Sequence, residues 1–397
     1  MARGPNHSVS RIVRRASAAI LALAATLVLS ACGGRTTPGP APAPDEILVG
    51  HYGSMTGSEA TFGRSSDEGF LLAVEERNAK GGVKGKKVRV KTYDTQGKTQ
   101  EAGTAVTRLV TDDKVVALLG EVASSLSIAG GRVAQQYGVP MITPASTNPA
   151  VTQVGDMVFR VCFLDSFQGE AVAKFAARSL KAKKVAILYD QGQAYSKGLK
   201  DYFGAAFAAL GGTVTTEQAY TGGDQDFSAQ LTTIRETMPD AVFVPGYYTD
   251  AGNVAIQARR LGLTAPLLGG DGWDSAKLAE IGGAAIEGSY FSNHYSHEDP
   301  RPEVQAFLAA YRAKHHGTPD AMVALAYDAA RLLFDAMDRA PSLSGKDLAA
   351  AIAATKDFAG VTGKITIDAD RNANKSAVIV QMKGGVPTFV ESIPPAE

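Results

Sequence analysis

The chain has 397 residues, with 40 Lys and Arg against 40 Asp and Glu, so its formal net charge is zero. A single hydrophobic core rarely grows to this length, which predicts at least two domains. No cluster of Lys and Arg carries interleaved aromatic residues, so nucleic acid is not expected as a partner. Cys32 and Cys162 are the only two cysteines, too few for a disulfide scaffold.

The N-terminus has the layout of an export signal. Several arginines precede an apolar run from Ala18 to Leu29, which is shorter than the roughly twenty residues of a spanning helix. The run ends in Leu29-Ser30-Ala31-Cys32, which resembles the bacterial lipobox and implies that Cys32 is lipidated. We therefore expect a lipoprotein signal peptide over 1–32, a Gly/Pro/Ala-rich tether over 33–45, and an extracytoplasmic protein anchored by lipid to a bacterial membrane.

The first part of the chain alternates strands and helices. The expected elements are a strand at 47–50, a Gly-rich loop at 51–58, a helix at 66–80, a strand at 88–94 and a helix at 99–112. This alternation predicts right-handed βαβ units and a parallel sheet.

The next stretch, Val115 to Pro149, reads as strand, helix, strand. A buried strand ends near Gly120, a helix capped by Ser124 or Ser125 follows, and a second strand at Met141-Ile142 ends in a hydroxyl-rich loop. Both loops belong at the carboxyl edge of one sheet, where free amides and hydroxyls suit a carboxylate or phosphate. The alternative is that these Ser and Thr residues are ordinary loop and capping residues.

The same pattern then recurs. Strands are expected at 185–189, 214–220, 241–245 and 266–269, followed by helices at 302–314, 321–340 and 345–355 and strands at 362–368 and 376–382. We expect the late helices to cover the first lobe and the last strands to return to the second. The fold class is therefore α/β, with two doubly wound, Rossmann-like lobes that face each other across a cleft.

In the second lobe, the residues that directly follow strands are aromatic or acidic. Tyr195, Tyr247, Tyr248 and Asp271 each lie just beyond an apolar strand, where side chains can project into a cleft. An α-amino acid needs an anion for its ammonium, amides and hydroxyls for its carboxylate, and an apolar wall for its side chain. The combination favours an amino acid as ligand.

From Ile47 to Met382 the order of motifs resembles the leucine/isoleucine/valine-binding proteins, which are type I periplasmic binding proteins of ABC amino-acid importers. The motifs that carry this resemblance are Ala79-Lys80-Gly81-Gly82-Val83-Lys84-Gly85, Met141-Ile142-Thr143-Pro144-Ala145, Leu164-Asp165-Ser166-Phe167-Gln168-Gly169, Asp226-Phe227-Ser228, Gln257-Ala258-Arg259 and Gly269-Gly270-Asp271-Gly272. The resemblance implies a three-strand hinge, with residues 46–164 and 294–374 in lobe I and residues 165–293 and 375–397 in lobe II.

The resemblance also implies a set of ligand-binding residues. Ser124 and Thr147 look like the carboxylate-binding hydroxyls, Ala145 offers a backbone carbonyl to the ammonium, and Asp271 falls where the family places its ammonium-binding acid. The aromatic positions match Tyr195 and Tyr247 in lobe II and Phe62 in lobe I, although aromatic residues at a domain interface can also be plain packing. The familiar branched-chain binders carry Glu in place of Asp271 and commonly Tyr in place of Phe62, and both departures bear on the preferred side chain.

Motifs for other chemistry are missing from the sequence. It contains no G-x-S-x-G, H-E-x-x-H or phosphate-binding glycine motif, so we expect no enzyme, cofactor or metal. His294 to Asp299 could in principle bind a metal, but we expect a solvated turn there. Cys162 is expected to be a free, buried thiol.

These observations predict a monomeric binding lipoprotein that captures an amino acid, branched-chain by resemblance, and delivers it to the permease subunits of an ABC importer. The alternatives are a sensor or amide-binding receptor of the same fold and, from another class, an anchored hydrolase, for which a nucleophile and base would be needed.

Overall fold

The computed structural model describes residues 46–394 of the chain, so the expected signal peptide, tether and Cys32 lie outside the described residues. The first lobe is built on a five-stranded sheet in the order β2-β1-β3-β4-β5, and every adjacent pair is parallel. Its strands are β1 (Glu46–Gly53), β2 (Lys87–Asp94), β3 (Ala117–Leu119), β4 (Met141–Thr143) and β5 (Val158–Arg160). The two central strands β3 and β4 are fully buried and continuously apolar except for Thr143, as expected for a sheet covered on both faces.

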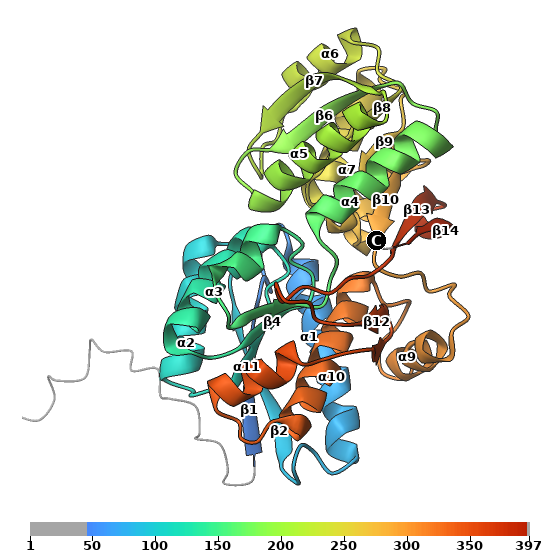
Figure 1. Cartoon of the computed structure of the whole chain (residues 1–397). Helices are drawn as coiled ribbons and strands as arrows, with labels where there is room; N and C mark the ends of the chain where they lie inside the picture. Colours follow the sequence, from blue (N-terminus) through green and yellow to red (C-terminus); the bar gives the residue numbers. More distant parts are fainter. Residues whose placement is uncertain (1–45, 395–397) are drawn as a thin grey trace, which may run out of the picture. The chain divides into compact units, whose positions relative to one another are not determined.

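Helices cover the two faces of this sheet (Figure 1). On one side α2 (Thr99–Thr111) and α3 (Ser124–Tyr137) pack together, and on the other α1 (Ala60–Ala79) packs against α10 (Ala321–Arg339). Nearly every residue of α10 is buried, because it is apolar around most of its circumference. The late helices also include α9 (Pro302–Arg312) and α11 (Gly345–Ala353).

The second lobe holds a seven-stranded sheet in the order β14-β13-β10-β9-β8-β6-β7. Its strands are β6 (Lys184–Asp190), β7 (Thr213–Tyr220), β8 (Ala241–Phe243), β9 (Leu267–Gly269), β10 (Tyr290–Asn293), β13 (Ala377–Lys383) and β14 (Val386–Ile393). The first five strands in chain order pair in parallel, whereas β13 is antiparallel to both β10 and β14. The helices are α4 (Asp165–Lys174), α5 (Ala194–Ala209), α6 (Ser228–Glu236), α7 (Tyr248–Arg260) and α8 (Ala276–Gly282), with short helical turns η1 (Pro149–Val154), η2 (Phe175–Ser179), η3 (Asp271–Trp273) and η4 (Gly283–Ile286).

The chain passes between the two sheets three times: between β5 and α4, after β10, and before β13. Buried Arg160 ties two of these crossings together. Its Nε donates to Asn372 Oδ1 at 2.7 Å, and one terminal nitrogen donates to the carbonyl of Asn148 at 2.8 Å. The expected α/β fold with two doubly wound lobes is confirmed.

Several local predictions were wrong. Helix α1 begins at Ala60, six residues before the expected Ser66, and α3 has Ala123 at its N-cap with no side-chain cap, so Ser124 is the first helical residue. The strand expected at 362–368 is a separate hairpin of β11 (Phe358–Gly360) and β12 (Gly363–Ile365). Strand β14 was missed because it lies at the sheet edge, where several apolar side chains are exposed and no clean alternation forms.

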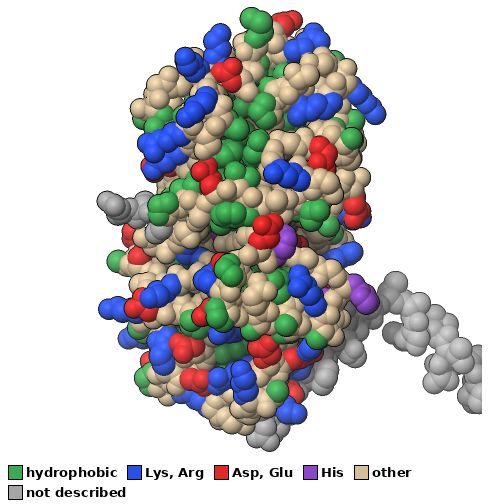
Figure 2. Space-filling view, turned by 90° about the vertical axis from the view of Figure 1, so that its right-hand side faces the viewer, with side chains coloured by type: hydrophobic (Ala, Val, Ile, Leu, Met, Phe, Trp, Pro, Cys, Tyr) green, Lys and Arg blue, Asp and Glu red, His purple; other side chains and the backbone are tan. Residues whose placement is uncertain are grey.

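The surface carries charges of both signs. On the face shown in Figure 2, Lys and Arg side chains are interspersed with Asp and Glu. Within residues 46–394, no helix is both long enough and apolar enough to cross a membrane.

Candidate functional site

The carboxyl ends of the strands in both sheets carry the predicted site residues. Ser124 follows β3, Ala145 and Thr147 follow β4, and Phe62 lies in the first turn of α1 after β1. From the second lobe, Tyr195 follows β6, Tyr247 follows β8 and Asp271 follows β9. All seven are buried, the most exposed being Tyr247 at 7%.

Asp271 is the most heavily hydrogen-bonded of these residues. Its Oδ1 accepts from Gln168 Nε2 at 2.7 Å and from Tyr195 Oη at 3.0 Å, and its Oδ2 lies 2.9 Å from His294 Nε2. The glycines around it are required by this close packing, since a Cβ on Gly270 would lie 2.3 Å from the Tyr195 hydroxyl oxygen. Three donors from three different elements therefore fix the plane of one buried carboxylate.

A second buried carboxyl, Asp165, lies beside this group. Its backbone amide donates to the Thr147 carbonyl at 2.9 Å, and the Thr147 side chain lies beside its carboxyl group. Burial raises the pKa of Asp165 well above its ordinary value, the Thr147 hydroxyl opposes the shift and the Asp271 carboxyl adds to it. A nearby cation would stabilise the charged form of this buried acid.

The hydroxyl-rich loops of the first lobe are held by Glu121. Its carboxylate accepts from the Ala123 amide at 2.7 Å, from Ser54 Oγ at 2.7 Å and from Thr95 Oγ1 at 3.0 Å. This fixes the entry to α3, whose first amides have no partner further back in the helix. The loop after β4 is anchored to the same place, because Ser146 Oγ donates to the Glu121 carbonyl at 3.0 Å.

Two hydroxyls of these loops are candidates for an anion. Ser124 Oγ accepts from the Asn148 amide at 3.3 Å, which links the β3 and β4 loops, and it retains its own proton to donate. Thr147 Oγ1 is fully buried, and the Thr147 side chain lies beside the Asp165 carboxyl. A carboxylate placed here would meet two hydroxyls and the positive end of the α3 dipole.

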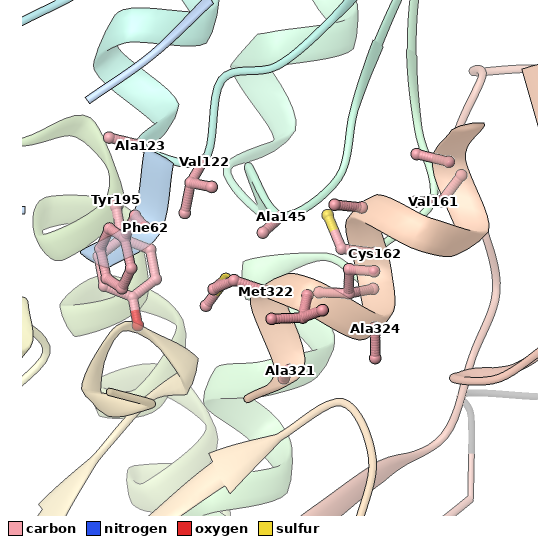
Figure 3. Close-up of a cluster of buried hydrophobic side chains, with 14 of the residues drawn as sticks. Phe62, Val122, Ala123, Ala145, Val161, Cys162, Tyr195, Ala321, Met322 and Ala324 are labelled. Atoms are coloured by element: carbon pink, nitrogen blue, oxygen red, sulfur yellow. The ribbon is translucent and has the colours of Figure 1, made fainter. Parts of the chain in front are cut away.

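An aromatic cluster forms the apolar side of the site. The Tyr195 and Tyr247 rings stack with centroids 5.3 Å apart, and Phe62, from the other lobe, meets Tyr247 edge-on at 5.4 Å. In Figure 3, Met322 points from the first turn of α10 toward the Phe62 and Tyr195 rings. The Tyr247 hydroxyl has no hydrogen-bond partner in the described chain.

The two lobes touch around the site. Asn148 Nδ2 donates to the Ala194 carbonyl at 2.8 Å, and the Ala194 amide donates to Ser125 Oγ at 3.0 Å. On the other side of the aromatic cluster, the Thr61 amide donates to Tyr248 Oη at 3.1 Å and Thr249 Oγ1 donates to the Ser58 carbonyl at 2.7 Å. The structure is therefore a closed state with the site enclosed between the lobes.

Direct contacts link the predicted residues in two groups. Asp271, Tyr195, Tyr247 and Phe62 form one continuous chain of contacts. Ser124 bonds to Asn148, whose side chain donates to the carbonyl of Ala194, next to Tyr195, and Thr147 bonds to Asp165. Ala145 is buried and makes no side-chain hydrogen bond, as its methyl group requires.

Sequence reasoning missed four residues of this site: Asp165, Gln168, His294 and Met322. Asp165 and Gln168 were visible in the Leu164–Gly169 motif, whose polar residues stand at helical spacing. His294 was assigned to a solvated turn, and that prediction was wrong, since His294 is 3% exposed and bonded to Asp271. Met322 gave no signal, because an apolar residue in an apolar helix reads as core.

Other expectations concern Cys162 and metals. Cys162 is a free, buried cysteine, as predicted, and burial raises the pKa of its thiol to about 12, so it stays protonated. No group of His, Cys, Asp and Glu side chains between residues 46 and 394 has the arrangement of a metal site.

Comparisons with known proteins agree with this architecture. A family model described as periplasmic binding protein matches residues 46–386. A Leu/Ile/Val-binding protein of Rhizobium johnstonii is 34% identical over 81% of this chain and 87% of its own length. Among solved structures, a leucine-binding protein of Thermotoga maritima is 42% identical with a TM-score of 0.85, covering 88% of this chain and 99% of its own. A branched-chain amino acid transporter substrate-binding protein of Streptococcus pneumoniae, solved with isoleucine, is 35% identical with a TM-score of 0.84, covering 88% and 100%.

The two-lobed fold and the enclosed site between the lobes define a solute-binding protein of the type I periplasmic class. The chain belongs to the periplasmic binding protein family and specifically resembles its branched-chain amino acid binders. These are extracytoplasmic solute-binding proteins and not enzymes, so the expectation of a binding protein is confirmed.

Asp165→Asn is expected to stabilise the ligand-free protein by about 1–3 kcal/mol at pH 7.5, because burial disfavours the ionised form of the wild-type carboxyl and asparagine has no acid to ionise. The folded-state pKa of Asp165 lies above the unfolded value, so the wild-type protein loses stability as the pH rises from about 4 through the folded-state pKa. The gain should therefore vanish near pH 4, where the acid is protonated in both states.

Calorimetric melting at the two pH values checks this, with Asp370→Asn, at an exposed position, as the matched control. A stabilisation by Asp165→Asn of the same size at both pH values, or none at either, would contradict the prediction.

Proposed function

We propose that this protein is an extracytoplasmic receptor that captures an amino acid between two closing lobes and delivers it to an ABC importer. The observation that carries the proposal is the buried carboxylate of Asp271 in the second lobe, which Gln168, Tyr195 and His294 contact, in the same site as the hydroxyls and helix amides at the start of α3 in the first lobe. A zwitterion would supply a partner to both at once, with its ammonium at Asp271 and its carboxylate at Thr147, Ser124 and the first amides of α3.

The aromatic cluster supports an apolar ligand side chain. Phe62, Tyr195, Tyr247 and Met322 would enclose an aliphatic group without offering it a charge, which fits leucine, isoleucine or valine. The relatives named for leucine or isoleucine support the same choice. Asp271 is one methylene shorter than glutamate, so the ligand would seat its ammonium deeper toward lobe II.

The contacts between the lobes support closure as the consequence of binding. Each lobe supplies part of the site, so only the closed form can hold both ends of the ligand, and the free energy of binding favours that form. We propose that the closed form is what the permease subunits recognise and that the receptor acts as a monomer.

The anchor and domain division are part of the same proposal. Residues 1–32 would be removed except for lipidated Cys32, residues 33–45 would tether the protein, and the two lobes would comprise 46–164 with 294–374 and 165–293 with 375–397. The three observed passages of the chain between the sheets support this division.

A thermal-shift screen against the twenty amino acids tests the ligand. We expect leucine, isoleucine or valine at a hundredfold excess over Kd to stabilise the protein by about 2.7 kcal/mol.

Asp271→Ala should weaken binding by about 2–5 kcal/mol, because the buried ammonium loses a charged partner, and calorimetric titration measures the loss. Asp370→Ala, an exposed change, should leave the affinity unaltered.

A protein that folds normally and responds to none of the amino acids would contradict the proposal, as would an Asp271→Ala variant of unchanged affinity.

Cys32→Ser is expected to release the full-length protein from membranes, because the serine hydroxyl cannot carry the thioether-linked lipid. Fractionation of cells that express the wild-type and variant proteins checks this, with Cys162→Ser as the control that keeps the anchor. If the Cys32 variant stays with the membrane, the lipid-anchor proposal fails.

A further inference from the structure

Among the described side chains that bond to Asp271, His294 alone comes from a passage between the lobes. His294 directly follows β10, and its ring is buried. The ring stacks on that of Phe163, which lies in the passage between β5 and α4; the ring centroids are 3.8 Å apart and the planes are 19° from parallel. Its Nε2 lies 2.9 Å from Asp271 Oδ2. One imidazole therefore connects two passages of the hinge to the acid of the ligand site.

The protonation state of this ring follows from its two nitrogens. A carboxylate oxygen can only accept, so Nε2 carries the proton that points to Asp271. Nδ1 is buried and has no partner within the described residues, so a second proton would be left without an acceptor there. The charged groups that act on the ring are Asp271 and Lys375; burial lowers the pKa of His294, Lys375 lowers it further, and Asp271 opposes the change.

A neutral donor at this place suits an acid that must receive an ammonium. A cationic partner would already neutralise Asp271, and the ligand would then compete with it for the same charge. A neutral N–H orients the carboxylate and leaves its full negative charge for the ligand. Gln168 and Tyr195, also neutral donors, occupy Oδ1, so Oδ2 is held by His294 alone among the contacts of Asp271.

We propose that His294, as the neutral tautomer protonated at Nε2, is the positioning residue that orients Asp271 for the ligand ammonium and couples it to the hinge. The inference rests on the proposed function for the identity of the ligand. It predicts that affinity depends on the Nε2 donor, and that this dependence acts only through the charge of Asp271.

Two variants separate the donor from the ring. His294→Phe keeps a ring to stack on Phe163 and removes the donor, and His294→Gln keeps an N–H donor and removes the aromatic ring. We expect His294→Phe to weaken leucine binding about tenfold to hundredfold, the cost of one hydrogen bond to a charged group, and His294→Gln to retain most of the affinity. In the Asp271→Asn background, His294→Phe should cause little further loss, since coupled residues are not additive.

Calorimetric titration with leucine measures the affinities of five proteins: wild type, His294→Phe, His294→Gln, Asp271→Asn and the Asp271→Asn/His294→Phe double variant. ¹⁵N NMR of the histidine rings measures the tautomer. The NMR spectrum should assign His294, identified by its loss in His294→Gln, to the Nε2–H tautomer between pH 5.5 and 8. The proposal is overturned if His294→Gln binds as weakly as His294→Phe, if the losses at 271 and 294 simply add, or if the ring is cationic in this range.

The failure of the proposed function would look different. If the wild-type protein binds no amino acid, the proposed ligand is wrong. The NMR tautomer of His294, and the non-additivity of the thermal stabilities of the Asp271 and His294 variants, would still decide whether His294 holds Asp271. Normal leucine binding by wild type with an unaffected His294→Phe variant would remove only the role of His294.

Discussion

The structure depends on keeping negative charge buried where two lobes meet. Asp271 is enclosed, yet three neutral donors satisfy its oxygens without cancelling its charge. Asp165, close by, has the Thr147 side chain beside its carboxyl group, and burial still raises the pKa of that carboxyl well above its ordinary value. A ligand ammonium would add a favourable charge interaction with this buried acidic group.

The opposite end of the site has the complementary character. The start of α3 offers the Ser124 hydroxyl and the first amides of the helix as donors, and hydrogen bonds to the Glu121 carboxyl fix the loop that carries them. Because the acidic groups come mainly from the second lobe and the hydroxyl and amide donors from the first, the zwitterion that we propose as ligand would be held by both lobes. Three passages of the chain link the two sheets behind the site, and Arg160 and His294 are buried in them.

Much of the fold followed from the sequence, because buried parallel strands are continuously apolar and helices between them have a clear period. The carboxyl ends of the strands that precede Tyr195, Tyr247 and Asp271 were predicted for the same reason. The sequence could not reveal β14, whose apolar residues are partly exposed, or the start of α1, where no side chain caps the helix. It also could not place His294, because a polar residue in a Pro-flanked loop gives the same local signal whether water or a carboxylate is its partner.

The central claim is that one ligand is held by both lobes at once, and its most direct test is the distance between them. Exposed Tyr137, on the last turn of α3, and exposed Met238, beyond α6, can be replaced by cysteines and spin-labelled, while Cys162 is buried. Pulsed electron paramagnetic resonance should show one shorter distance when leucine saturates the protein, and no shortening with 4-methylpentanoate, which lacks the amine. Equal shortening with both compounds, or an unchanged distance with bound leucine, would contradict the account.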